Sequence, residues 1–181
     1  LIDSGKIKVV CEDYVTNWDP ADAQSKMEQC LTKTQNGVDA VLGFYDGITA
    51  GALAAMTAKG VKFPVYGGQN PELSGLQYML TGQQEDMVMK NFGDEAKVAA
   101  TLTAAALNGQ KPPKPPVNSV VNNGAANIPT ASISVDYFYL VPGQDIAATI
   151  DKKVVKQGIF TWKQICTGVA ANTAGCAKYN K

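Results

Sequence analysis

The sequence of 181 residues contains no histidine. This absence removes Ser-His-Asp and Cys-His catalysis, and with them the commonest metal ligand, so an enzyme would depend on carboxylates, lysine or tyrosine. Basic and acidic residues balance at 16 each. The chain therefore lacks the excess positive charge that holds nucleic acid or an anionic membrane surface, which argues against both partners. No apolar run approaches the roughly 18 to 20 residues that span a bilayer.

Hydrophobic residues nevertheless make up 45% of the chain, which is ample for a packed core, and the length predicts one domain or slightly more. The chain begins at Leu1, which is not an initiator, and residues 1–5 resemble the end of a helix running into a turn. No signal-peptide pattern precedes them. We therefore expect this sequence to be the downstream part of a longer polypeptide.

Short apolar runs alternate four times with amphipathic segments. Asp19-Pro20 and Asn70-Pro71 each supply a capping residue followed by proline, and Gly60 and Gly82 are typical helix ends. This alternation predicts an α/β fold with a parallel sheet and right-handed crossovers. Strands are expected at residues 7–11, 40–44, 63–66 and 87–89, and helices at 20–34, 48–59, from about 70 to 82 and from about 95 to 107.

The pattern changes after residue 110. The proline-rich stretch 110–116 predicts an extended connector, and residues 120–121 and 133–140 read as strands. An amphipathic stretch and a short helix capped by Thr161 come next. Cys166 and Cys176 then flank a segment of small residues that has little to bury, so we predict a disulfide there, worth about 2.7 kcal/mol. Such a bond persists outside the reducing cytosol and favours an exported protein.

The other two cysteines carry a weaker signal. Cys30 lies on the apolar face of its expected helix and Cys11 on an expected strand. We interpret both as buried thiols, although a bond between them remains an open alternative.

Polar and aromatic residues follow each expected strand, where ligands bind in doubly wound sheets. Together they suit a neutral polyol, whose ring stacks on an aromatic while its hydroxyls bond to charged or bidentate groups. No glycine-rich phosphate cradle is present. Each residue also has a structural alternative: a cover for the sheet end, a helix cap, a charge in the first helical turn, or a solvated strand end. The candidate sugar-binding residues are Trp18, Asp22, Tyr45, Asp46, Gln69, Asn70 and Lys90.

Several of these runs resemble the type I periplasmic sugar-binding proteins of ABC importers, and within them the D-xylose-binding group. The similarity lies in residues 14–27, 46–52 and 66–70, and later in 122–129 and 154–160. The resemblance implies a two-lobed α/β protein with three-layer, doubly wound parallel sheets that closes over one sugar, without cofactor or metal. It implies an ABC permease as partner and an exported protein, either periplasmic or lipid-anchored at the outer face of the cell membrane.

The resemblance also implies a division of the chain. Residues 1–68 would belong to the C-terminal lobe, 69–111 would return to the N-terminal lobe, and 112–181 would form the C-terminal lobe, hinge return and tail. The first part of the N-terminal lobe would be missing, so that segment or another chain would complete the fold.

Carried over by position, Trp18 matches a stacking tryptophan, Asp46 a cleft aspartate and Lys90 a cleft lysine, while Gln69 and Asn70 match a polar pair at the hinge. Two features depart from the family. Asp22 replaces an asparagine, and Phe44-Tyr45 replaces a small residue and an asparagine, which leaves the sugar open between xylose, other aldopentoses and further monosaccharides.

Other functions share this fold or these residues. The alternatives are the effector domain of a LacI-type repressor and a sensor-coupled sugar receptor. A hydrolase that used Asp22 and Asp46 would need a defined carboxylate spacing, for which the sequence offers no support.

Overall fold

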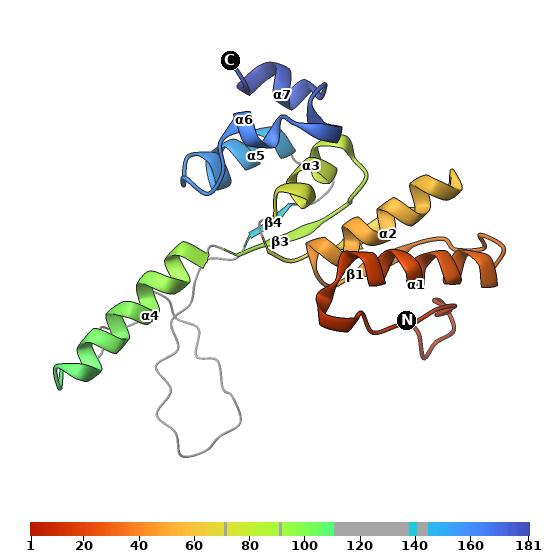
Figure 1. The fold of residues 1–181 in the computed structure, drawn as a ribbon, viewed down its shortest axis with the longest axis horizontal. Helices are drawn as coiled ribbons and strands as arrows, with labels where there is room; N and C mark the ends of the chain where they lie inside the picture. Colours follow the sequence, from red (N-terminus) through yellow and green to blue (C-terminus); the bar gives the residue numbers. More distant parts are fainter. Residues whose placement is uncertain (71, 91, 111–137, 141–144) are drawn as a thin grey trace. The chain divides into compact units, whose positions relative to one another are not determined.

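The structure is a computed structural model that describes residues 1–70, 72–90, 92–110, 138–140 and 145–181. Contacts divide the chain into two compact units, Leu1–Met89 with Phe138–Lys181, and Lys90–Tyr137. The helices, labelled in Figure 1, are α1 (Pro20–Lys33), α2 (Asp46–Lys59), α3 (Leu73–Thr81), α4 (Phe92–Leu107), α5 (Ile146–Ile150), α6 (Trp162–Ile165) and α7 (Ala174–Tyr179). The strands are β1 (Val41–Gly43), β2 (Val65–Gly67), β3 (Met87–Met89) and β4 (Phe138–Leu140).

Helix α1 begins where its capping signal predicts. The Asp19 carboxylate accepts a hydrogen bond from the Ala21 amide at 2.9 Å, and Pro20 occupies the first helical position, where its missing N–H costs nothing. Its buried face consists of the four residues that helical spacing selects, Ala23, Met27, Cys30 and Leu31.

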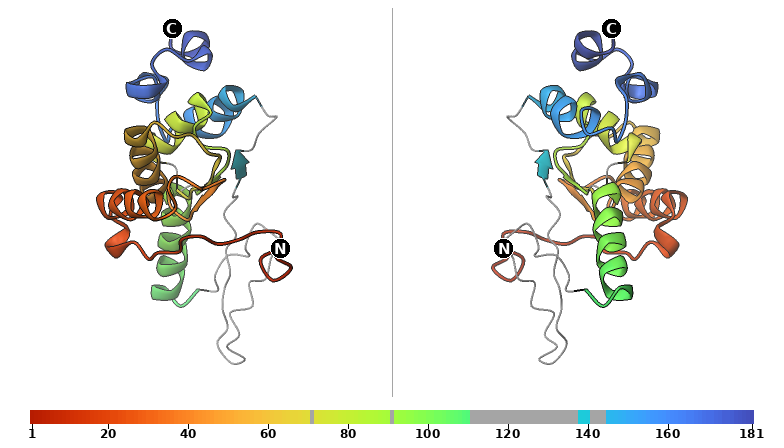
Figure 2. Two further views of the ribbon diagram at one scale, coloured as in Figure 1. Left: turned by 90° about the vertical axis from the view of Figure 1, so that its right-hand side faces the viewer. Right: turned by 90° about the vertical axis from the view of Figure 1, so that its left-hand side faces the viewer.

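Helices α1 and α2 pack side by side, as the two views in Figure 2 show. Gly51 permits this contact, because a Cβ there would collide with the Pro20 carbonyl oxygen and lie 2.9 Å from the Ala23 Cβ. Leu31, Ala55, Met56 and Val65 lie at the centre of the resulting core. This close packing brings the start of α2 against the start of α1.

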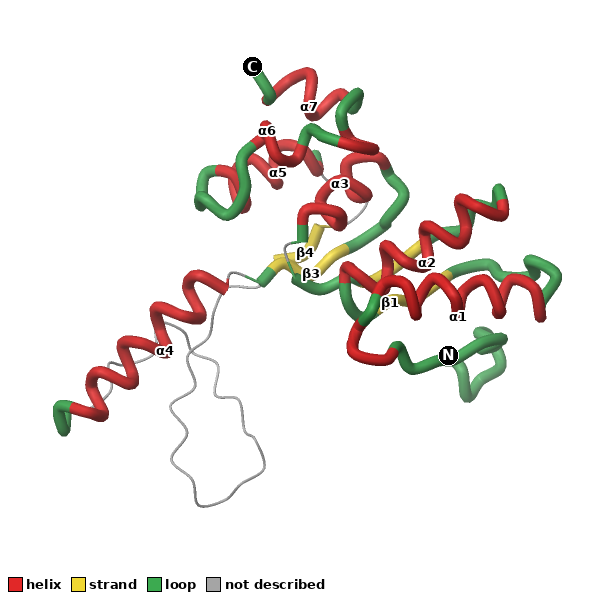
Figure 3. The backbone as a smooth tube through the Cα atoms, viewed as in Figure 1, coloured by secondary structure: helices red, strands yellow, loops and turns green. Residues whose placement is uncertain are grey.

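Strands β1 and β2 pair in parallel, with Leu42 opposite Tyr66. Figure 3 draws the strands in yellow. The parallel alignment continues beyond β2 as a bridge between Gln69 and Val88, and the Val88 amide donates to the Gly68 carbonyl at 3.0 Å. Strand β3 in turn pairs antiparallel with β4. The α/β class and the parallel pairing of β1 with β2 are therefore confirmed, whereas the pairing of β3 with β4 is antiparallel.

The strand expected at residues 7–11 does not form. Within the described ranges no strand lies beside this segment, and Ile7 and Val9 stay exposed. A β-branched run becomes a strand only where a neighbour accepts its backbone hydrogen bonds. Instead, Cys11 is bonded to Cys30 of α1, with their Cα atoms 6.0 Å apart. The interpretation of these cysteines as free thiols was wrong, and the alternative of a bond between them was right.

The helix expected from Asn70 also starts differently. Helix α3 begins at Leu73 with Glu72 as its N-cap residue, so Asn70 is not the cap. The Asn70 amide donates to the Val88 carbonyl at 3.1 Å, and its φ of 88° is left-handed, which keeps the residue beside the sheet. Gly82 ends α3 in the left-handed conformation, as predicted.

A second core joins α3 and β3 to the C-terminal helices. It centres on Leu76, Met87, Ile150 and Ile165. The Gln77 side chain of α3 reinforces it by donating to the Ile165 and Thr167 carbonyls, both at 3.1 Å. The first unit therefore extends past residue 68, through α3 and β3, to Met89.

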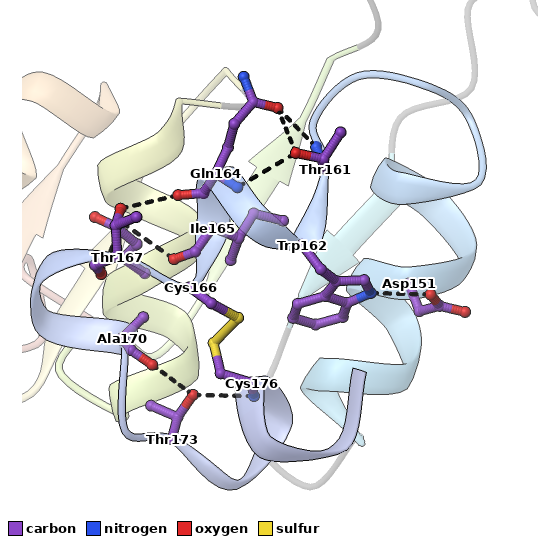
Figure 4. Close-up of a disulfide and its surroundings, with 11 residues drawn as sticks. Asp151, Thr161, Trp162, Gln164, Ile165, Cys166, Thr167, Ala170, Thr173 and Cys176 are labelled. Atoms are coloured by element: carbon purple, nitrogen blue, oxygen red, sulfur yellow. Dashed lines mark hydrogen bonds between the residues drawn. A yellow bond between two sulfur atoms is a disulfide. The ribbon is translucent and has the colours of Figure 1, made fainter. Parts of the chain in front are cut away.

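A disulfide between Cys166, at the end of α6, and Cys176, in α7, links the C-terminal helices (Figure 4). Thr161 caps α6 in a reciprocal capping box with Gln164, as its position in the sequence predicts. The Trp162 indole N–H donates to Asp151 at 3.0 Å, and its ring stacks on Tyr179 at a centroid distance of 4.9 Å.

The second unit contains helix α4, which begins three residues before the expected start and ends at the expected residue. The strand expected at 120–121 lies outside the described residues, as do residues 111–116 of the connector expected at 110–116 and residues 133–137 of the strand expected at 133–140. The described remainder of that last strand, residues 138–140, forms β4. None of the helices in the described ranges is long and apolar enough to cross a membrane.

Candidate functional site

The loops after β1 and β2 meet at the carboxyl ends of these strands. Tyr45 and Asp46 follow β1, and Gln69 follows β2. The Asp46 amide donates to the Gln69 carbonyl oxygen at 3.3 Å, which joins the two loops directly. The structure thus brings together three of the predicted site residues at the sheet edge where ligands bind in α/β folds.

Trp18 lies on a turn that precedes α1. Asn17 and Trp18 both have left-handed backbones, with φ of 52° and 60°, and the Trp18 side chain is 60% exposed. The Asp22 carboxylate holds this turn by accepting from the Thr16 amide at 2.7 Å. A large exposed aromatic on a strained turn is the kind of feature that collects at binding sites. Asp22 is therefore a residue that supports the Trp18 turn.

Trp18 and Tyr45 meet edge to face. Their ring centroids are 5.8 Å apart and the planes cross at 85°, a favourable aromatic geometry. The Tyr45 hydroxyl donates to the Glu72 carboxylate. The pKa of Tyr45 is raised to about 12, mainly by this hydrogen bond and secondly by burial. Tyr45 therefore joins the exposed indole to an acidic group on the next loop.

Asp46 is fully buried. It is the first residue of α2, two residues before the expected start, and Tyr45 is the N-cap. Its Oδ2 accepts from the Glu72 amide at 3.0 Å, while Oδ1 has no partner among the described residues. Burial raises the pKa of Asp46 to about 8, and the nearby Glu72 charge adds to this rise, although hydrogen bonds from the amides of Glu72 and Gln69 oppose it. Asp46 thus connects α2 to the loop before α3.

The remaining candidates are placed as follows. Gln69 is half-buried in the bridge to β3, and Asn70 uses its backbone to extend that bridge. Lys90 is the first residue of the second unit, and its role as a sugar-binding residue stays a prediction. The described residues include no group of three or more ligand side chains that could hold a metal ion.

Sequence reasoning missed two residues near these loops. The Glu72 carboxylate accepts a hydrogen bond from the Tyr45 hydroxyl, and the Glu72 amide donates to Asp46 Oδ2 at 3.0 Å. Gln84 is 2% exposed, and its amide donates to the Gly67 and Asp86 carbonyls at 2.8 and 2.9 Å, which fixes the end of β2. Glu72 could have been found as the polar residue between Pro71 and the apolar face of α3. No sequence signal distinguishes Gln84 from an ordinary turn residue.

Comparisons with known proteins identify the family. The family model described as periplasmic binding protein domain matches residues 2–111. The D-xylose-binding periplasmic protein of Escherichia coli K12 is 35% identical over 130 residues, which cover 71% of this chain and 38% of that protein. Its namesake in Haemophilus influenzae is 33% identical over 166 residues, covering 91% of this chain and 47% of the relative. The chain thus spans less than half the length of these curated relatives.

A solved structure shares the fold. An ABC transporter solute-binding protein from Clostridium phytofermentans, with bound β-D-glucose, superposes with a TM-score of 0.66 at 22% identity. The match covers 82% of this chain and 44% of that protein. At this level of identity the likeness establishes the fold alone.

Proposed function

This chain belongs to the periplasmic binding protein domain family, and from this premise we propose that it takes part in binding a neutral monosaccharide in an interlobe cleft, without chemical turnover. Xylose or another aldopentose is the proposed ligand, because two relatives are named as D-xylose-binding proteins. The proposed sugar-binding residues are Trp18, Asp22, Tyr45, Asp46, Gln69, Asn70 and Lys90.

One observation carries the proposal: an exposed indole lies edge-on to a tyrosine that in turn bonds a carboxylate. The apolar C–H face of a sugar ring stacks on an aromatic surface, and carboxylates accept hydrogen bonds from its hydroxyls. Trp18 supplies the surface, while Tyr45 and the adjoining loops supply the polar groups.

We further propose that the protein delivers its sugar to an ABC permease from outside the cytoplasm, either in the periplasm or anchored by lipid at the outer face of the cell membrane. The disulfides Cys11–Cys30 and Cys166–Cys176 support export, because such bonds are rare in the reducing cytosol. They count against the alternative of a cytosolic LacI-type repressor domain.

We propose the division of the chain that the resemblance implies. Residues 1–68 belong to the C-terminal lobe, residues 69–111 return to the N-terminal lobe, and residues 112–181 form the C-terminal lobe, hinge return and tail. Completion of the N-terminal lobe by a further segment or chain is part of the proposal.

Calorimetry of the full chain against a panel of pentoses and hexoses tests the function. Trp18→Ala should lower affinity by roughly 5- to 150-fold, because it removes stacking worth about 1 to 3 kcal/mol. Tyr14→Ala is the matched control, since Tyr14 is 91% exposed and precedes the same turn. Equal affinity of the Trp18 variant and the parent would show that the assigned site is wrong.

A further inference from the structure

Glu72 occupies a position that the function proposed above leaves unused. It follows β2 and precedes α3, at the carboxyl end of the parallel strands. Its amide donates to Oδ2 of the buried Asp46 carboxyl group at 3.0 Å, so its backbone is fixed to the start of α2. The residue is therefore held firmly at the edge of the sheet where Trp18 and Tyr45 meet.

The Glu72 side chain does not serve the helix that it precedes. An N-cap side chain ordinarily accepts a hydrogen bond from an amide of the first turn, but Glu72 makes no such bond. One carboxylate oxygen, Oε1, instead accepts from the Tyr45 hydroxyl. The other, Oε2, has no hydrogen-bond or ion-pair partner in the part of the chain that the structure describes. A structural cap would place these atoms differently.

We infer that Glu72 is a hydroxyl-binding residue of the proposed sugar site and that Tyr45 is a positioning residue that aims its carboxylate. Tyr45 contacts Trp18 with its ring and Glu72 with its hydroxyl, so it fixes the acceptor relative to the stacking surface. A carboxylate held through one oxygen keeps lone pairs on the other for one or two ligand hydroxyls. Hydrogen bonds to an ionised acceptor are also about twice as strong as neutral ones.

The same arrangement specifies the class of ligand. Glu72 Oε2 accepts but does not donate, and no described cation pairs with it. A sugar acid would place a second negative charge beside this carboxylate, and like charges repel at close range. The site should therefore take neutral sugars and reject the corresponding sugar acids. This inference rests on the proposed sugar-binding function and adds a residue and a selectivity to it.

The decisive variant is Glu72→Gln in the full chain, which keeps the shape and removes the charge. Calorimetry with xylose, glucose and xylonate should show a loss of roughly 10- to 100-fold in affinity for the preferred neutral sugar, as removal of a charged acceptor implies. Discrimination against xylonate should shrink at the same time. Glu12→Gln, at an exposed glutamate, is the matched control and should bind as the parent does.

A double-mutant cycle tests the positioning role of Tyr45. Tyr45→Phe keeps the ring contact with Trp18 and frees Glu72, so it should weaken binding in the parent. In the Glu72→Gln background the same change should have little further effect, because residues that act through one another are non-additive. Additive losses would overturn the positioning role.

The outcomes separate the two proposals. Sugar binding that depends on Trp18 but is unchanged in Glu72→Gln would overturn this inference and leave the proposed function intact. Absence of binding to every sugar by a folded parent whose two lobes are complete would overturn both. If circular dichroism shows that Glu72→Gln does not fold, two other measurements decide. Unchanged sugar affinity in Tyr45→Phe would refute the inference. Equal binding of xylose and xylonate by the parent would also refute it.

Discussion

The buried carboxyl of Asp46 should make the stability of this protein fall as pH rises through the neutral range. Asp46 has no exposed surface, and its Oδ1 has no hydrogen-bond partner among the described residues. Burial moves its pKa from 3.8 to about 8. In the folded chain the carboxyl is therefore protonated at pH 6, whereas in the unfolded chain it is ionised.

The sign and size of the effect follow from proton linkage. Between about pH 4 and pH 8 the folded state binds one more proton at Asp46 than the unfolded state, so each unit of pH lowers the free energy of unfolding by about 1.4 kcal/mol. From pH 5 to pH 7 the loss is roughly 2.7 kcal/mol. The sequence contains no histidine, the side chain that ordinarily titrates there.

Urea unfolding of the full chain at pH 5, 6 and 7, followed by the fluorescence of the buried Trp162, measures this slope. Asp46→Asn mimics the protonated carboxyl and should flatten it, while the matched control Asp39→Asn, at an exposed aspartate, should keep it. The same pH dependence in the parent and in Asp46→Asn would refute the reasoning.

Three other predictions concern the frame around the site. Replacing both Cys166 and Cys176 by serine should lower the free energy of unfolding by about 2.7 kcal/mol, because it removes the disulfide that joins the C-terminal helices. A thermal denaturation curve identical to that of the oxidised parent would contradict this. Gly51→Ala should lower the free energy of unfolding by about 1 to 3 kcal/mol through overpacking, since its Cβ would meet the Pro20 carbonyl. Gly82→Ala is the comparison, because Gly82 has a left-handed φ of 70° and open space around it. Unchanged stability of the Gly51 variant in urea unfolding would show that the helices separate easily. Leu42→Lys should reduce self-association of residues 1–181 in analytical ultracentrifugation. Leu42 is 63% exposed on β1, which pairs with β2 on one edge only among the described residues, and an open strand edge can pair with another chain. A sedimentation coefficient that does not differ from that of the parent at any concentration would rule this surface out.

Local signals predicted the elements that depend on local chemistry. Asp19-Pro20 predicts the start of α1, Gly60 and Gly82 predict the ends of α2 and α3, and Thr161 predicts the cap of α6. Each of these signals works within a few residues of itself, through a side-chain cap or a left-handed backbone, and does not depend on the rest of the fold.

Signals that need a distant partner were less reliable. The run at residues 7–11 has the composition of a strand, but without a described strand beside it the segment forms none, and Ile7 and Val9 stay exposed. The sequence favoured buried thiols at Cys11 and Cys30 and left a bond as the alternative, because only the packing of the N-terminal segment on α1 brings their Cα atoms to 6.0 Å.

The sequence by itself determined the fold class, the alternation of strands and helices, and the set of polar residues that follow the strands. Only the tertiary structure decided how those residues are used: Asp22 supports the Trp18 turn, Asp46 is buried with a raised pKa, and Glu72 is bonded to Tyr45. The physical reason is that periodicity reports which face of an element is apolar. Burial, pKa and hydrogen-bond partners are instead properties of loops brought together from distant parts of the chain, here residues 18, 45 and 72.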